Sequence, residues 1–386
     1  MQEKSKRILI FSLVYFPRFI GGAEVAVKEI TDRIPDASFD MVTLRTEHDR
    51  NMQVGNVTIY GVGPYCGGSG ILQKILRTII KHIYPFLALV KATKLHREYG
   101  YTHTWSIMAS YAGFAALFFK WRYPKILFLL TLQEGDPIAY IKRRAFLVYP
   151  LFVEIFRRAD TIQVISNYLA TFAKDMGYSN EPVVIPNGVT IEHFSKDIPE
   201  EEIVGLQKKL GKQPEDIFIM TASRLVKKNG VKDIVEALVF LPKQYKLVVA
   251  GQGKLEKSLK SKVTNLKLED RVIFVGFISH ELLPLYLKAS DIFVRPSLSE
   301  GLGNSFLEAM AAGIPVVGTP VGGIPDFLTD RETGIFCDSE NPASIAKAVR
   351  LYEDIKLKQK IIINAKELVI KKFDWDAVTQ KMSNLL

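Results

Sequence analysis

Short apolar runs alternate with longer amphipathic stretches along the whole chain, and this alternation limits what the chain can fold into. The apolar runs have the length of buried strands, and the stretches between them repeat apolar residues at helical spacing. Strands that alternate with helices form parallel sheets that are covered on both faces. The sequence therefore predicts an α/β fold built from Rossmann-like, doubly wound parallel sheets.

The expected strands fall into two series. Those of the first series are Ile8–Leu13, Asp40–Leu44, Val57–Tyr60, Tyr101–Trp105, Ile126–Thr131, Thr161–Ile165 and Val183–Ile185. Those of the second are Ile217–Ala222, Lys246–Ala250, Val272–Val275, Ile292–Val294 and Pro315–Val317. Helices are expected between them, and one of these covers Lys142–Arg158.

A chain of 386 residues is too long for one compact core and suits two domains. Pro186–Val189 and the charged, strand-poor stretch from Glu192 to about Pro214 separate the two series of strands. We expect one Rossmann-like domain over residues 1–200 and a second over residues 201–370. A helix over residues 371–386 is expected to pack back on the first domain.

Composition excludes several classes of protein. Apolar residues make up 48% and charged residues 24% of the chain, which argues against a disordered or fibrous protein. The two cysteines, Cys66 and Cys337, lie far apart, so the sequence predicts neither a disulfide framework nor a cysteine zinc site. No export signal is recognisable, and the uncharged stretch Tyr99–Phe119 is better interpreted as a strand followed by a buried helix than as a membrane span. These features predict a soluble protein of the cytoplasm.

Two glycine- or cation-containing loops follow expected strands, where open parallel sheets bind ligands. Gly21 and Gly22 lead into a helix, whose first N–H groups and dipole suit a phosphate or sugar oxygen. Arg224 and Lys228 follow the strand Ile217–Ala222 and could hold a diphosphate. Plain tight turns and solvated cations remain the alternatives for these loops.

The strongest feature runs from Arg295 to Gly313. Glu300 lies in a loop after an expected strand, and Glu308 lies a few residues into the next helix, among apolar neighbours. An acid in such a helix needs a partner, which could be a ribose diol, while the other carboxylate could accept hydrogen bonds from sugar hydroxyls. The helix entry between them, at Gly303, Asn304 and Ser305, presents backbone N–H groups to a phosphate.

This segment resembles the Glu-x7-Glu signature of retaining glycosyltransferases with the GT-B fold, in particular family 4 (glycosyl transferase group 1). Further segments resemble motifs of that family in the same order along the chain. They are Phe19–Glu24, Val183–Phe194, Ala222–Gly230, Val272–Phe277, Gly313–Gly323 and Phe373–Trp375. The resemblance implies two Rossmann-like domains that face a central cleft, the first on the acceptor side and the second binding the nucleotide-sugar donor.

The resemblance also implies roles for single residues. Glu300 would contact the donor sugar, Glu308 the nucleotide ribose and Arg224 the diphosphate, while Gly22 would approach the reaction centre and the backbone around Phe277 would meet the base. Two positions depart from the family pattern. Asn229 stands where the family has Lys before the glycine, with Lys228 one residue earlier. Gln133 and Glu134 stand where the family has His, so one of them is expected to contact the donor sugar or the acceptor hydroxyl, or Glu134 is only a turn acid bound to local N–H groups.

The expected reaction moves a sugar from a UDP- or GDP-linked donor to a hydroxyl, with retention of configuration, in cell-envelope polysaccharide or glycolipid synthesis. No metal or other cofactor is expected, because the six histidines have no ligand spacing and no Asp-x-Asp lies at a strand end. A nucleotide-sugar epimerase of similar fold is the alternative enzyme. A non-catalytic sugar-binding or nucleic-acid-binding protein is the alternative from another class, and nucleic acid is not the expected partner because exposed aromatics do not interleave with the basic residues.

The stretch Ile71–Arg97 contains six Lys or Arg residues and no acid, with apolar residues at helical spacing. Residues 1–190 also hold eight of the ten net positive charges of the chain. A basic amphipathic helix can lie on an anionic membrane, which would suit a lipid-linked acceptor and a peripheral location on the inner face of the plasma membrane. A core-facing helix with a solvated basic face explains the same pattern.

Overall fold

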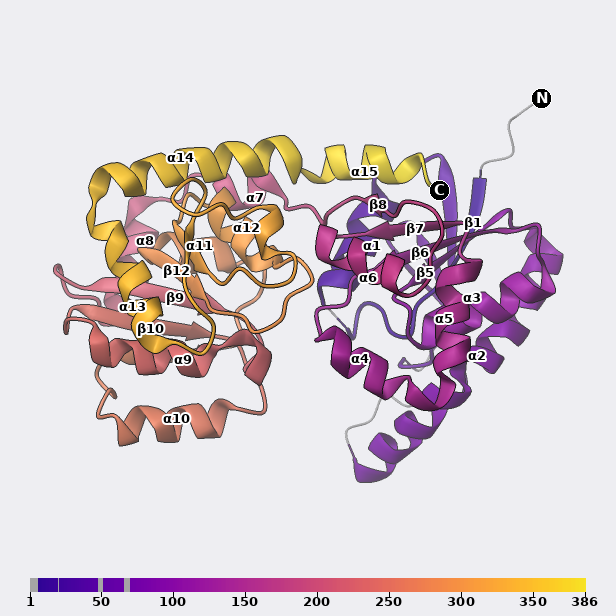
Figure 1. Cartoon of the computed structure of the whole chain (residues 1–386), viewed down its shortest axis with the longest axis horizontal. Coiled ribbons are helices and arrows are strands. Elements are labelled where there is room, and N and C mark those ends of the chain that lie inside the picture. Colours follow the sequence, from indigo (N-terminus) through magenta and orange to yellow (C-terminus); the bar gives the residue numbers. More distant parts are fainter. Residues whose placement is uncertain (1–5, 20, 48–50, 66–69) are drawn as a thin grey trace. The chain divides into compact units, whose positions relative to one another are not determined.

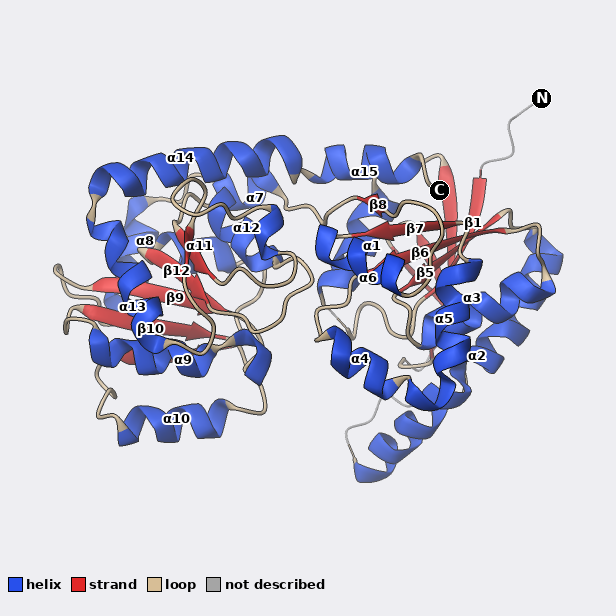
Figure 2. Ribbon diagram, viewed as in Figure 1, coloured by secondary structure: helices blue, strands red, loops and turns tan. Residues whose placement is uncertain are grey.

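The computed structural model describes residues 6–19, 21–47, 51–65 and 70–386 (Figure 1). The chain divides into two compact units. The first contains the described residues up to Asn187 together with Trp375–Leu386, and the second contains Gly188–Asp374. Figure 2 shows that each unit consists of strands with helices packed around them, as expected for α/β units.

The first unit is built on an eight-stranded sheet with the order β3-β4-β2-β1-β5-β6-β7-β8. Its strands are β1 (Lys6–Phe11), β2 (Ala37–Leu44), β3 (Asn51–Val54), β4 (Val57–Val62), β5 (His103–Ile107), β6 (Leu127–Leu132), β7 (Thr161–Val164) and β8 (Val183–Val184). All neighbours are parallel except β3 and β4. The strand order reverses between β1 and β5, so a ligand crevice is expected beyond the carboxyl ends of these two strands.

The helices of the first unit connect these parallel strands. They are α1 (Gly22–Asp32), α2 (Ile71–Tyr99), α3 (Tyr111–Arg122), α4 (Ile138–Arg144), α5 (Tyr149–Arg158) and α6 (Asn167–Asp175), followed at the end of the chain by α15 (Trp375–Ser383). The uncharged stretch Tyr99–Phe119 holds β5 and most of α3, as predicted. Among the described residues, no helix combines the length and the apolar character that a membrane crossing requires.

The second unit has a six-stranded, fully parallel sheet with the order β11-β10-β9-β12-β13-β14. Its strands are β9 (Ile217–Ala222), β10 (Tyr245–Ala250), β11 (Val272–Gly276), β12 (Ile292–Arg295), β13 (Val316–Gly318) and β14 (Ile335–Phe336). Its helices are α7 (Ile191–Ser195), α8 (Glu200–Lys209), α9 (Val231–Ala237), α10 (Glu256–Asn265), α11 (Leu283–Lys288), α12 (Asn304–Ala311), α13 (Pro342–Arg350) and α14 (Ile355–Lys372). The order reverses between β9 and β12, which puts the loops after these two strands at the switch point.

The first unit ends earlier than the boundary near residue 200 that the sequence suggested. The charged stretch after Asn187 forms α7 and α8, which pack on α12 and α11 of the second unit. The chain returns to the first unit after Asp374, where Trp375, Val378, Met382 and Leu386 join the core around β1, β2 and β5. Helix α15 contacts α1, and Asp376 pairs with Arg33 at 2.9 Å.

Three local expectations need correction. Strands β3 and β14 were not expected, because one is short and partly polar and the other has only two residues. The single helix expected over Lys142–Arg158 is broken into α4, a 3-10 turn at Phe146–Val148 and α5, which has Pro150 in its first turn. Proline is tolerated there because the first N–H groups of a helix need no partner within it.

The structure describes Cys337, one of the two cysteines of the chain. Cys337 is a free, buried thiol whose Sγ donates to the carbonyl of Gly318 at 3.4 Å. Cys66 and His48 lie outside the described residues. Within the part of the chain that the structure describes, no three His, Cys, Asp or Glu side chains gather as ligands for a metal ion.

Candidate functional site

Arg295 connects the two loops at the switch point of the second unit. It is the last residue of β12, and its guanidinium donates to the amide oxygen of Asn229 at 3.1 Å and to the hydroxyl of Ser305 at 2.9 Å. The same guanidinium pairs with the carboxylate of Glu300. Asn229 belongs to the loop after β9, so one largely buried cation joins the loop after β9, the loop after β12 and the first turn of α12.

Glu300 is held as tightly as its partner. Only 12% of its side chain is exposed, against 11% for Arg295. The loop after β13 fixes its backbone, since the carbonyl of Glu300 accepts from the N–H of Gly323 at 3.2 Å. Gly322 has a φ of +59°, and a Cβ at that position would lie 1.8 Å from the Glu300 carbonyl oxygen. Glycine is therefore required for the two loops to approach this closely.

Helix α12 begins beside these groups. Gly303 precedes the helix with a φ of +105°, and no side chain caps the helix there. Asn304 and Ser305 form its first turn, where the helix dipole places partial positive charge. The structure thus brings Gly303, Asn304, Ser305 and Glu300 together with Arg295, for which the sequence predicted no role.

Glu308 lies further along α12, between buried apolar neighbours. Burial raises the pKa of its carboxyl to about 7, and the positive charge of Arg295 opposes this rise only in part. Its Oε1 lies 3.8 Å from Nε2 of His280, whose ring stacks on His193 with 5.0 Å between ring centroids. Reasoning from the sequence did not identify His280, because this residue stands in an irregular loop after β11.

The residues after β9 differ in how far their side chains are exposed. Asn229 is buried, and its amide donates to the carbonyl of Arg224 at 2.7 Å. The side chain of Arg224 is exposed. Lys228 is partly exposed, and its carbonyl accepts from the N–H of Leu298 at 2.7 Å. Asn229 therefore shapes this loop from inside, while Arg224 remains accessible to an anion.

Phe277 follows β11 and is 73% exposed. The exposed ring lies in the same loop as His280, at the carboxyl end of a strand. This position suits a flat ligand, and the structure assigns no partner to the ring within the described residues.

Four of the sequence-predicted residues of the first unit lie at the start of α1 or after β6. Gly21 and Gly22 are exposed at the beginning of α1, although Ile20 beside them lies outside the described residues. A Cβ on Gly21 would lie 2.6 Å from a carboxylate oxygen of Glu24. The glycine pair therefore leaves backbone accessible at the positive end of the helix dipole.

Gln133 and Glu134 follow β6, and their side chains form hydrogen bonds with different neighbours. The Gln133 side-chain oxygen accepts from the amide of Asn187 at 3.1 Å. One carboxylate oxygen of Glu134 accepts from the N–H of Ala109, after β5, at 2.9 Å, and the other is buried without a hydrogen-bond partner in the described structure. Burial raises the pKa of Glu134 to about 7. A carboxyl that titrates near neutral pH and lies next to a switch point can donate or accept a proton in catalysis.

Parts of the chain are similar to known glycosyltransferases. Residues 205–368 match the family described as glycosyl transferases group 1. An uncharacterized glycosyltransferase from Methanocaldococcus jannaschii is 32% identical over 205 residues, which cover 52% of this chain and 53% of that protein. The alpha-monoglucosyldiacylglycerol synthase of Streptococcus pneumoniae is 30% identical over 211 residues, which cover 52% of this chain and 48% of that enzyme. These two matches thus span about half the length of each relative.

The architecture also matches solved structures. The Anabaena protein HepE, solved in complex with UDP and glucose, has a TM-score of 0.79 and 20% sequence identity, with 98% of this chain and 99% of that chain covered. At this identity the likeness concerns the fold. The two α/β units of this chain therefore have the architecture that its sequence predicted.

Proposed function

We propose that the protein is a retaining glycosyltransferase, because residues 205–368 match the glycosyl transferases group 1 family and the two units have the GT-B architecture. It moves a sugar from a UDP- or GDP-linked donor to a hydroxyl group. The bond between the anomeric carbon and the diphosphate oxygen breaks, the acceptor oxygen bonds to that carbon, and the acceptor hydroxyl gives up its proton. The nucleoside diphosphate leaves with the bonding electron pair.

The observation that carries this proposal is the cluster around Arg295 at the switch point of the second unit. Glu300 is fixed there by Arg295 and by the loop after β13. A carboxylate held in this way is preorganised to accept hydrogen bonds from sugar hydroxyls. The exposed Arg224, Lys228 and the start of α12 supply positive charge for the departing diphosphate.

Other residues complete the proposed donor and acceptor sites. Glu308 binds the ribose diol, and the exposed Phe277 and its backbone meet the base. Gly21 and Gly22, at the exposed start of α1, bind a phosphate or sugar oxygen of the donor in this proposal. Gln133 and Glu134 contact the donor sugar or the acceptor hydroxyl, and the position of Glu134 after β6, beside the loop that follows β5, supports this assignment.

The names of relatives guide the substrate class. The Streptococcus relative synthesises a glucosyl diacylglycerol, and HepE was solved with UDP and glucose. We propose a nucleotide-sugar donor, a sugar or lipid-linked acceptor of cell-envelope glycolipid or polysaccharide synthesis, and a location on the cytoplasmic side of the membrane. Stabilisation of the diphosphate by protein groups makes a metal ion unnecessary in this proposal.

A thermal-shift series with UDP, GDP, ADP and their sugars tests the donor. A nucleotide at about 100 times its dissociation constant should add about 2.7 kcal/mol to the free energy of unfolding. Incubation with the stabilising donor and candidate acceptors, with and without EDTA, should give a product with the donor's anomeric configuration in both cases. Loss of transfer in EDTA and its rescue by Mg²⁺ or Mn²⁺ would contradict the metal-free proposal, and an epimerised donor without transfer would contradict sugar transfer.

Single substitutions test the assigned roles in the same assay. Glu300→Gln should lower turnover strongly and leave binding of the free nucleotide nearly intact, whereas Glu308→Gln should weaken nucleotide binding. Glu300→Gln also leaves the buried Arg295 without its carboxylate, so melting must show that the variant is folded at the assay temperature. Glu269→Gln changes an exposed carboxylate and serves as the control. Wild-type transfer rates in both site variants would refute the donor-site assignment.

A further inference from the structure

Helix α2 exposes a row of large apolar side chains that the fold does not use. The row consists of Ile71, Ile75, Ile79, Ile83, Phe86 and Val90, which are between 42% and 77% exposed. At about 100° per residue these six positions fall within about a third of the helix circumference. The opposite side of the helix holds the buried residues Ile80, Tyr84 and Ala88. An apolar row of this length is a site for contact with something outside the chain.

The row continues onto helix α3. The ring of Phe86 stacks on that of Phe118, with 5.4 Å between ring centroids. The ring of Phe118 also packs against that of Trp121, with 5.7 Å between ring centroids. Trp121 is 47% exposed. We call the row together with Phe118 and Trp121 the α2–α3 surface. Because two helices contribute to it, the surface is broader than a single amphipathic stripe.

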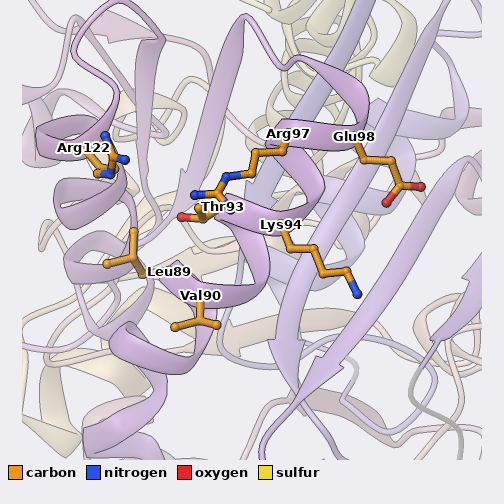
Figure 3. Close-up of a pocket in the computed structure, with 7 residues that line it drawn as sticks. All are labelled: Leu89, Val90, Thr93, Lys94, Arg97, Glu98 and Arg122. Atoms are coloured by element: carbon orange, nitrogen blue, oxygen red, sulfur yellow. The ribbon is translucent and has the colours of Figure 1, made fainter.

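A basic groove adjoins the α2–α3 surface. It has a volume of about 780 Å³ and is lined by Leu89, Val90, Thr93, Lys94, Arg97, Glu98 and Arg122. Figure 3 shows Arg122 reaching this groove from a neighbouring helix, while the other labelled residues come from α2. Val90 belongs to both features, so the apolar row leads directly into the groove. In the part of the chain that the structure describes, none of the three cations Lys94, Arg97 and Arg122 forms an ion pair.

This combination of an apolar row and unpaired cations fits one kind of partner. Apolar side chains enter the boundary between headgroups and acyl chains, and Lys and Arg at the same depth attract anionic headgroups. Helix α2 carries no acid before Glu98 that would repel such a surface. We infer that the α2–α3 surface lies on an anionic phospholipid membrane, with a headgroup phosphate in the groove beside Lys94, Arg97 and Arg122.

The structure also separates these cations from the earlier basic residues of the same helix. Lys74, Arg77 and Lys81 lie at least about a third of a turn from the centre of the apolar row, as helical spacing requires. Arg77 and Lys81 are only partly exposed. We therefore expect the anionic headgroup to contact the cations at the groove. Charge reversal of Lys74, Arg77 and Lys81 should weaken membrane binding less than charge reversal of those cations.

Vesicle flotation of the full chain, without donor or acceptor, tests the inference independently of sugar transfer. The protein should float with vesicles of phosphatidylcholine and phosphatidylglycerol, should not float with phosphatidylcholine alone, and should bind less at high salt. Since each cation near an anionic surface is worth about fivefold in partitioning, Lys94→Glu, Arg97→Glu and Arg122→Glu together should weaken binding at least about a hundredfold. The matched control, Lys208→Glu, Lys243→Glu and Lys257→Glu, makes the same charge change on exposed lysines of the second unit and should bind as wild type does.

A second pair of variants tests the apolar row. Ile75→Asp with Ile79→Asp should abolish flotation, whereas Ile363→Asp with Ile370→Asp, on exposed positions of α14, should not. All four positions are exposed, so circular dichroism and melting should show folded proteins. Wild type that fails to float with anionic vesicles at low salt overturns the inference, as does a groove variant that floats as well as wild type. Dimerisation in sedimentation that the Ile75 and Ile79 changes abolish, without flotation, would assign the surface to a second copy of the chain.

Discussion

Glu308 is a carboxylic acid that helix α12 largely buries among apolar side chains, with 17% of its side chain exposed. Burial raises its pKa from 4.5 to about 7, so the folded protein keeps this carboxyl protonated where an unfolded chain would ionise it. The unfolded state then binds fewer protons than the folded state between these two values. Stability contributed by the neutral carboxyl is complete below pH 4.5 and is lost as the pH rises toward about 7.

Glu308→Gln should remove this pH dependence. One pKa unit corresponds to about 1.4 kcal/mol, so the variant should gain up to about 3 kcal/mol relative to wild type between pH 4.5 and pH 8. Melting of both proteins across this range measures the difference, with Glu269→Gln as an exposed control whose difference from wild type should stay constant. If the difference in stability between Glu308→Gln and wild type is the same at every pH in this range, folding does not raise the pKa of Glu308 and the prediction is wrong.

At the scale of elements, the loop after β13 fixes the loop that carries Glu300. Gly322→Ala would bring a Cβ to 1.8 Å from the Glu300 carbonyl oxygen and would force the two loops apart. A displacement of about 1 Å at a positioned group can cost about a hundredfold in rate, so we expect a loss of this order in turnover. Gly313→Ala is the matched control, because Gly313 has a φ of +77° and no atom within 4 Å of its Cβ position. An equal loss of turnover in both variants would contradict the prediction. It would show that the strain of an alanine at positive φ, rather than the close approach of the two loops, causes the loss.

The elements also show what the sequence could and could not predict. The strands with clear apolar runs, such as Ile217–Ala222, were located correctly, because burial on both faces of a parallel sheet demands such runs. The role of Arg295 was missed, although its position at a strand end was visible. Its partner Asn229 lies after β9, and chain order does not reveal that β9 and β12 are neighbours. Site residues within one motif were found, whereas contacts between motifs required the strand order.

At the scale of the whole molecule, the first unit is completed by residues that come after the second. Trp375 is only 3% exposed and packs in the core of the first unit with Val378 and Met382. Trp375→Ala should therefore cost about 3–5 kcal/mol in the free energy of unfolding of that unit. Hydrogen exchange should show faster exchange in β1, β2 and β5 and little change in β9, β10 and β12. The control Trp121→Ala changes a residue that is 47% exposed and should alter hydrogen exchange in neither set of strands. If Trp375→Ala speeds exchange equally in the strands of both units, the prediction is wrong.

The return of the chain to the first unit also sets an order of events during synthesis. A ribosome makes residues 188–374 in one continuous stretch, so all the strands of the second sheet emerge before Trp375 does. Until then, β1 and its neighbours lack the side chains that α15 contributes to their core. The half of the protein that is translated first can thus complete its core only after the other half has been made, and until then the apolar side chains that α15 covers lack that cover.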